Sequence, residues 1–264
     1  MKKFLVILLA LTMVLAFAAC TVKDSEGDDT NADTSTDTAA DSVSDTAADT
    51  AADTTGDEVA VMSYADYVAA AIDDEVVIEA YVQGKQSWWE NEGVGVATIY
   101  TQNEEGAYFL YEMPISEEDY AKLVLGTKIR VSGYKAEWSG EVEIIDATYE
   151  ILEGDTFVAE PVDLTDKLGA EELIDYQNQL ASFKGMTVES ISYKDSEWDP
   201  DIYVTLSLNG ASYDFCVENY LYGPDSEVYQ AVAALETGAV IDVDGFVYWY
   251  EGVNPHITSV TVVE

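Results

Sequence analysis

The residues best suited to chemistry in this sequence are large aromatic side chains that gather in a few short, carboxylate-rich stretches. They are Trp88, Trp89, Trp138, Trp198, Tyr248, Trp249 and Tyr250. Indole and phenol rings offer flat apolar faces with a polar edge, so they can stack on sugar rings or on aromatic groups of a peptide. The acidic residues of the same stretches could accept hydrogen bonds from hydroxyl groups or pair with amines: Glu90, Glu92, Glu137 and Glu141. Lys85 and Lys135 are the basic exceptions near the same rings.

The alternative interpretation of these rings is structural. Aromatic side chains at hairpin ends can pack across neighbouring strands, which stabilises a sheet by up to about 1 kcal/mol per pair. Both interpretations place the rings near the ends of strands, and the sequence leaves the choice between them open.

No set of residues has the spacing of a catalytic or metal site, apart from carboxylate pairs, which are uninformative because Asp and Glu are so frequent in this sequence. A Ser/His/Asp set, a glycine-rich phosphate loop and a Cys/His metal motif are all missing from the sequence. Residues 195–201 alternate carboxylates but lack the glycine and the distal glutamate of a calcium loop, so we interpret them as a solvated acidic loop. The single histidine, His256, and the isolated Cys216 are weak evidence for a site. We therefore expect neither enzyme activity nor a metal or other cofactor.

The net charge of −41 narrows the expected partners. Lys and Arg together number 11, against 52 Asp and Glu. Affinity for nucleic acid depends chiefly on Lys and Arg that displace counterions from phosphates, and a negative surface also repels anionic lipid headgroups. The charge therefore disfavours nucleic acid and favours neutral, cationic or metal-bearing partners.

The first twenty residues predict secretion. Two lysines follow Met1, residues 4–19 are apolar except for Thr12, and Cys20 comes next. A basic start, a short apolar run and small residues at its end are typical of a signal peptide, and the run is too short to favour a membrane span. The junction Leu-Ala-Phe-Ala-Ala-Cys resembles the bacterial lipobox. The resemblance implies cleavage before Cys20 and diacylglycerol on its sulfur, hence a lipid anchor on the extracellular or periplasmic side of the cell membrane.

Residues 20–58 are interpreted as a disordered acidic linker. Asp recurs at every fourth position from Asp29 to Asp57. On a helix these like charges would lie on one face and repel, and the segment holds too few apolar residues to form a core. We expect a flexible tether that spaces the folded part from the membrane by at least about 35 Å.

An internal repeat organises the rest of the chain. Residues 126–134 align without gaps on residues 238–246, both with the pattern Gly-x-x-Ile-x-Val-x-Gly-aromatic. The same spacing of 112 pairs Gly140 with Gly252, and residues 77–80 match residues 187–190 at a slightly different offset. A repeat of this length indicates a duplicated domain, with one copy at 59–160 and the other at 161–264.

Each copy is predicted to contain the same series of elements. In the first copy these are a helix at 64–72, strands at 76–83, 95–100 and 108–113, a helix from 116, and strands at 128–138 and 142–151. In the second copy they are a helix at 171–180, strands at 186–193, 202–208 and 211–217, a helix at 225–235, and strands at 240–250 and 256–263.

Three strands, a helix and two strands is an order that resembles the OB-fold, a five-stranded Greek-key barrel. The likeness is to bacterial extracytoplasmic and lipoprotein OB modules and covers residues 62–152 and 170–264. We therefore predict a mainly β protein with short helices, built as two tandem OB-fold-like five-stranded barrels after the linker.

The resemblance implies a binding barrel, because OB-folds bind near the loop after strand one and the loop between strands four and five. The aromatic residues above lie in those loops. We expect a ligand-binding module for a saccharide, a peptide or a protein partner. The alternative is an envelope assembly or spacer protein that only docks another protein. Nucleic-acid binding is the usual expectation for an OB-fold, and the charge argues against it.

Overall fold

The computed structural model describes residues 60–194 and 200–263. Residues 55–264 form one compact unit that holds two six-stranded sheets and a few short helices. The predicted signal peptide, Cys20, the acidic linker and Trp198 lie outside the described residues. None of the described helices has the length and apolar character needed to cross a membrane.

The first sheet closes into a barrel. Its strands are β1 (Glu75–Lys85), β2 (Trp89–Asn91), β3 (Val94–Gln102), β4 (Ala107–Pro114), β5 (Lys128–Trp138) and β6 (Glu141–Ile151), with helices α1 (Tyr64–Ala69) and α2 (Glu117–Lys122). The sheet order is β1-β5-β6-β4-β3-β2, and a further pairing of β1 with β3 closes the ring of five long strands. Strands β4 and β6 run parallel, whereas the other pairs are antiparallel.

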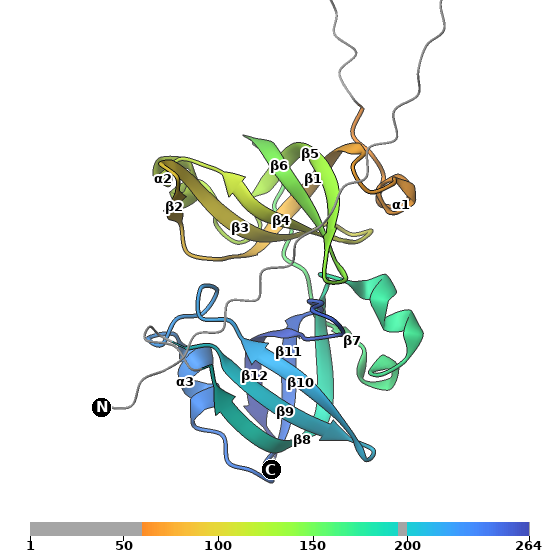
Figure 1. Ribbon diagram of the computed structural model, residues 1–264, viewed down its shortest axis with the longest axis vertical. Helices are drawn as coiled ribbons and strands as arrows, with labels where there is room; N and C mark the ends of the chain where they lie inside the picture. The colour runs from red at the N-terminus through yellow and green to blue at the C-terminus, as the bar shows by residue number, and fades with distance from the viewer. Residues whose placement is uncertain (1–59, 195–199, 264) are drawn as a thin grey trace, which may run out of the picture. The chain divides into compact units, whose positions relative to one another are not determined.

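The five long strands of the second sheet repeat this arrangement. It contains β7 (Val162–Asp163), β8 (Leu180–Tyr193), β9 (Ile202–Leu208), β10 (Ala211–Val217), β11 (Val240–Phe246) and β12 (His256–Val262), with helix α3 (Glu227–Ala233). Its order is β11-β12-β10-β9-β8-β7, closed by β11 with β8, and β10 runs parallel to β12. The predicted fold class is confirmed: the protein is mainly β, with two tandem OB-fold-like barrels (Figure 1). Each barrel carries one short extra strand, β2 or β7.

Alternation along the strands builds a separate core in each barrel. In β1 every second side chain is buried, from Val76 through Ile78 and Ala80 to Val82, as expected where one face of a sheet turns inward. The core of the second barrel forms in the same way around Phe183. Each barrel therefore has its own apolar interior.

The repeated glycine of the sequence motif has a structural reason. A Cβ on Gly133 would lie 2.8 Å from the carbonyl oxygen of Ile145, and a Cβ on Gly245 would lie 2.7 Å from the carbonyl oxygen of His256. The register between strands four and five shifts at both positions. A glycine in a strand often marks such a bulge or close backbone approach, so both copies need glycine there.

The structure differs from the predicted elements mainly at the start of the second copy. The expected helix at 171–180 is a 3-10 helix, η2 (Glu171–Tyr176), and a second one, η1 (Thr165–Lys167), precedes it. No side chain caps η2, and Asn178 adopts a φ of +65°, so the chain leaves the helix early. Strand β8 therefore begins at Leu180 rather than at residue 186.

The last hairpin differs as well. Strand β11 ends at Phe246 rather than at residue 250, because the N–H of Val247 donates to Gln179 and Trp249 pairs with Val253 in a local turn. This early end releases the following aromatic residues from the sheet.

A third apolar cluster joins the two barrels. It consists of Tyr100 on β3, Phe109 on β4 and Phe246 on β11. The rings of Tyr100 and Phe246 stack with centroids 4.2 Å apart and planes within 6°. The Tyr100 hydroxyl also shares a hydrogen bond of 2.8 Å with Nδ1 of His256. The contact between the barrels is therefore buried and specific.

Candidate ligand-binding site

A cavity of about 580 Å³ lies between the two barrels, within the range of about 300–1,000 Å³ typical of small-molecule sites. Its lining residues are Gln86, Thr98, Phe109, Tyr111, Trp138, Glu143, Lys194, Asp201, Tyr203, Cys216, Glu218, Tyr220, Tyr248, Tyr250, Asn254 and His256. Strands β3 and β4 contribute from the first barrel, and β9 and β10 from the second. These are the second and third strands of each unit, the face with which OB-folds bind.

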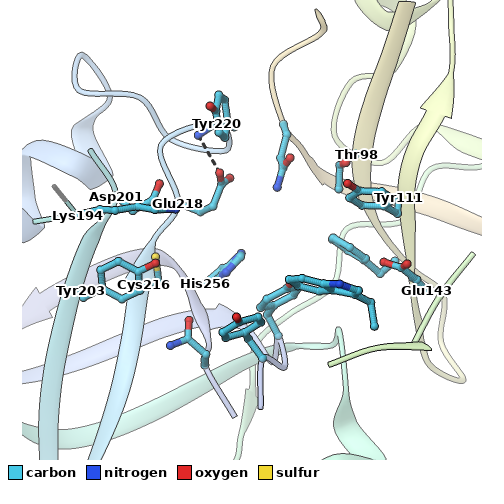
Figure 2. A pocket seen from close by; sticks show the side chains of 16 residues that line it. Thr98, Tyr111, Glu143, Lys194, Asp201, Tyr203, Cys216, Glu218, Tyr220 and His256 are labelled. Carbon is cyan, nitrogen blue, oxygen red and sulfur yellow. Dashed lines mark hydrogen bonds and ion pairs between the residues drawn. The ribbon is translucent and has the colours of Figure 1, made fainter. Parts of the chain in front are cut away.

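Figure 2 shows the division of the site between the barrels. Thr98, Tyr111 and Glu143 lie on one side of the cavity, and Tyr203 and Cys216 lie on the other. Each barrel therefore supplies part of the lining, and neither barrel makes the cavity alone.

Three of the sequence-predicted aromatic residues meet at this cavity. Trp138 at the end of β5 is 53% exposed, and Tyr250 is 49% exposed. Their ring centroids are 5.2 Å apart, with planes inclined by 35°. Tyr248 is half-buried between Phe109, at 5.5 Å, and His256, on which it stacks at 4.2 Å. The hairpins of the two copies thus bring flat, partly free ring faces to one place.

The other predicted aromatic residues do not line it. The Trp88 indole is half-buried against the core of the first barrel and donates from Nε1 to the Ile115 carbonyl at 2.9 Å. The Trp249 ring packs against the core of the second barrel. Trp89 is exposed on β2, away from the cavity lining. Trp88 and Trp249 therefore have the packing role that was the structural alternative for the aromatic residues.

Two carboxylates of the cavity lack a cationic partner. Glu143 on β6 is only 7% exposed, and burial, aided by the charge of Glu112, raises its pKa to about 7. Glu218 accepts hydrogen bonds from the backbone N–H groups of Tyr220, at 3.2 Å, and Leu221, at 2.9 Å. Burial raises the pKa of Glu218 to about 7 as well. Both groups are therefore poised to change charge near neutral pH.

The third carboxylate, Asp201, is compensated. Its Oδ2 lies 3.4 Å from Nζ of Lys194, and its Oδ1 accepts from both the backbone and side-chain nitrogens of Asn219, at 3.0 and 2.8 Å. Among residues 60–194 and 200–263, Lys194 is the only lysine or arginine that lines the cavity.

Cys216 and His256 also line the cavity, and both are buried. Burial raises the pKa of the Cys216 thiol, and it lowers the pKa of His256 to about 3. Both side chains are therefore neutral at pH 7. Among residues 60–194 and 200–263, no three or more His, Cys, Asp or Glu side chains are grouped so that they could hold a metal ion.

The two lysines expected near the rings serve the fold instead. Nζ of Lys135 donates to the carbonyl oxygens of Tyr67, Val68 and Ala70 at 2.8–3.0 Å, where the helix α1 leaves carbonyl groups free. Lys85 donates to the Tyr120 carbonyl and lies 3.7 Å from the centroid of the ring of the same residue. Glu141, also expected beside the ligand, is fully buried.

Sequence reasoning missed Glu143, Glu218 and His256 as lining residues. The spacing of 112 offered one signal, since it pairs His256 with Ile144, a buried apolar residue of the first copy. Nothing in the sequence distinguishes Glu143 and Glu218 from the other acidic residues, because Asp and Glu together number 52.

This chain resembles known proteins in fold alone, through similarity to solved structures. No family model matches it, and no curated protein matches its sequence. Similar solved structures include a murine DNA-binding protein bound to double-stranded DNA (12% identity, 71% of this chain and 95% of that chain, TM-score 0.36). Another is the p204 HINb domain (10% identity, 74% of this chain and 100% of that chain, TM-score 0.35). A third is a Replication Protein A heterotrimer bound to single-stranded DNA (16% identity, 72% of this chain and 49% of that chain, TM-score 0.32).

These similarities contradict the expectation that nucleic acid is a disfavoured partner, because several of the similar chains were solved with DNA bound. The expectation used net charge, which governs contacts to phosphates. It ignored the stacking of bases on aromatic side chains, which contributes to single-strand binding independently of net charge.

Proposed function

We propose that this protein is a ligand-binding module whose site is the cavity between its two barrels. The observation that carries the proposal is the convergence of the second and third strands of both barrels on one cavity, together with Trp138, Tyr248 and Tyr250 from the two hairpins. An OB-fold binds with this face and these loops. Flat or ring-shaped groups of a saccharide or a peptide can stack on the exposed ring faces.

The surroundings of the rings support binding. Trp138 and Tyr250 stay about half exposed, although an aromatic pair with only a packing role would gain stability from deeper burial. The few polar groups beside them, among them Thr98 and Asn254, can orient a ligand by hydrogen bonds. A mostly apolar cavity with a few placed polar groups is the usual form of a small-molecule site.

The test is an array of oligosaccharides, peptides and single-stranded oligonucleotides probed with the protein, followed by titration of each hit. Trp138→Ala should weaken binding at least about tenfold, since it removes a stacking face worth about 1.4 kcal/mol or more. Trp89→Ala is the matched control, because Trp89 is similarly exposed but does not line the cavity.

Equal loss of binding in both variants would contradict the proposed site. Binding that neither variant changes would do the same. If no small ligand binds and crosslinking in intact cells yields one dominant protein adduct, the module docks another protein, and the ligand-binding proposal is wrong.

We further propose, on sequence grounds, that the chain is a lipoprotein anchored to the cell membrane through Cys20. The apolar run and the lipobox-like junction before Cys20 support this proposal. Cys20→Ser should move the protein from the membrane fraction to the soluble fraction, whereas Cys216→Ser, which changes the one other cysteine, should not. A Cys20→Ser protein that stays with the membrane and keeps its mass would refute the anchor.

A further inference from the structure

The charges around the cavity are unbalanced within the described part of the chain. Glu143, Asp201 and Glu218 line it, and Lys194 is the one lysine or arginine that does so. Lys194 pairs with Asp201 at 3.4 Å. The other two carboxylates, Glu143 and Glu218, form no ion pair with Lys194, although its charge lies near Glu218.

Glu143 is the more unusual of the two. The residue is only 7% exposed, and no described residue donates a hydrogen bond to its carboxylate or forms an ion pair with it. Partial burial of a carboxylate without a partner for its charge is unfavourable. A polar group left in this condition beside a cavity is best explained by a partner that the cavity itself receives.

Glu218 is oriented toward such a role. The backbone N–H groups of Tyr220 and Leu221 donate to its two oxygens and hold the carboxylate in place. Figure 2 marks the bond from Tyr220. Neutral donors fix the direction of the group but do not balance its charge. A carboxylate held in this way is ready to accept a charge-assisted hydrogen bond from a ligand.

The aromatic rings that line the cavity also favour a cationic ligand. The face of an aromatic ring carries negative electrostatic potential, so it attracts a cation placed over it, by about 2 kcal/mol or more when water is excluded. Phe109, Tyr111, Trp138, Tyr248 and Tyr250 line one cavity with the two carboxylates. A neutral ligand would use the ring faces but leave both carboxylates without a counter-charge.

From this geometry we infer that the ligand of the cavity presents a positively charged nitrogen, an alkylammonium or a guanidinium group, to Glu143 or Glu218 and to the surrounding rings. The inference rests on the proposed function, since it names the ligand class of the same site. It commits to one chemical feature, which a lysine or arginine side chain of a peptide carries.

The test compares cationic ligands with neutral ones of the same shape. The probes are tripeptides with an acetylated N-terminus and an amidated C-terminus, titrated into the full protein by calorimetry. One pair contains lysine or Nε-acetyl-lysine, and the other contains arginine or citrulline, so that only the side chain differs in charge. Neutral oligosaccharides and single-stranded oligonucleotides complete the panel. We expect each cationic peptide to bind at least about tenfold more tightly than its neutral form, as one charge-assisted pair is worth about 1.5–3 kcal/mol.

Two variants assign the effect to the cavity. Either Glu143→Gln or Glu218→Gln, at the carboxylate that pairs with the cation, should weaken binding of the cationic peptides about tenfold and leave binding of the neutral peptides unchanged. Glutamine at position 218 keeps one acceptor oxygen and loses one of the two backbone hydrogen bonds, so urea unfolding of both variants is measured beside binding. Glu153→Gln is the control, because Glu153 is exposed and lies outside the cavity lining.

Binding should also depend on pH. Glu143 and Glu218, with pKa values near 7, must ionise to pair with the cation, so affinity should rise between pH 6 and pH 8. The charged neighbours are Glu112 beside Glu143, and Asp201 with Lys194 beside Glu218. Binding should release protons, which calorimetry in two buffers of different ionisation enthalpy detects.

The outcomes separate this inference from the proposed function. If a neutral saccharide or an oligonucleotide binds in a Trp138-dependent way and the cationic peptides bind no better than their neutral forms, the charge inference is wrong and the proposed site stands. If no member of the panel binds, both fail.

Discussion

Replacing Glu141 by glutamine should stabilise the protein at alkaline pH and have no such effect in acid. Glu141 is fully buried at the start of β6. Its Oε2 accepts a hydrogen bond of 2.9 Å from the backbone N–H of Trp249, while no described residue donates a hydrogen bond to its Oε1. Burial raises the pKa of the carboxyl from 4.5 to about 8, against the opposing effects of the Asn178 amide and this backbone bond.

The direction of the effect follows from which state ionises. Below about pH 4.5 the Glu141 carboxyl is protonated in both the folded and the unfolded chain, so it adds no pH dependence. Between pH 4.5 and about 8 only the unfolded chain ionises, and the free energy of unfolding falls as the pH rises. Since one pH unit corresponds to about 1.4 kcal/mol, the loss reaches about 3 kcal/mol at pH 7 and at most about 5 kcal/mol above pH 8.

Glutamine keeps the useful contacts and removes the titration. Its carbonyl oxygen can accept the hydrogen bond from the backbone N–H of Trp249, and its amide group carries no charge at any pH. Glu141→Gln should therefore match the wild type near pH 4 and exceed it by several kcal/mol at pH 8.5. Part of the slope should remain, because the pKa values of Glu143 and Glu218 are also raised.

The assay is urea unfolding followed by tryptophan fluorescence at pH 4, 7 and 8.5 for the wild type, Glu141→Gln and the exposed control Glu153→Gln. The control should follow the wild type at every pH. Profiles of wild type and Glu141→Gln that run parallel across the whole range would refute the reasoning, since they would show that Glu141 does not titrate differently in the folded chain.

Three further changes test the packing around the site by thermal or urea unfolding. Trp88→Ala should lower the free energy of unfolding by about 3 kcal/mol, because its ring packs on a core, whereas the exposed Trp89→Ala should change it by less than about 0.5 kcal/mol. Gly140→Ala should destabilise by about 1–3 kcal/mol, since its φ is +93° and a Cβ would lie 2.7 Å from the Trp249 ring. Tyr100→Phe should lower stability by about 1–3 kcal/mol, because it leaves a buried histidine nitrogen without its hydrogen bond.

The fold could be predicted because its signals are local and occur twice. The motif in residues 126–134 and 238–246 places a bulged strand after a glycine turn, and the strand predicted at 128–138 coincides with β5. Ser116 accepts a hydrogen bond from the backbone of Asp119 and begins α2 as expected. What could not be predicted depends on tertiary contacts: β7 has two residues and no pattern of its own, and η2 ends early through a contact with the last hairpin.

The site could be predicted only in part, for a related reason. Trp138 and Trp249 lie in equivalent hairpins, yet the first is half exposed at the cavity and the second packs on a core. Residue type assigns both tryptophans to one class, but the repeat aligns Trp138 with Tyr250, which is also half exposed at the cavity, and aligns Trp249 with Glu137. Glu143 could not be predicted as a cavity residue either. Its place in the lining depends on burial among elements that are distant in sequence, and its neighbours along the chain do not reveal it.

The duplication itself accounts for a site that neither copy has alone. Trp138 and Tyr250 occupy equivalent positions in the repeat, and their rings meet at the cavity. The equivalent aromatic residues Tyr134 and Phe246 differ: the first is 47% exposed, whereas the second is 1% exposed and stacks on Tyr100 of the other barrel. The aromatic residue of the motif therefore contacts the other barrel in the second copy, whereas in the first copy it is half exposed. Because that junction brings the binding strands of both units together, a change that separates the barrels should abolish the cavity while leaving both cores intact.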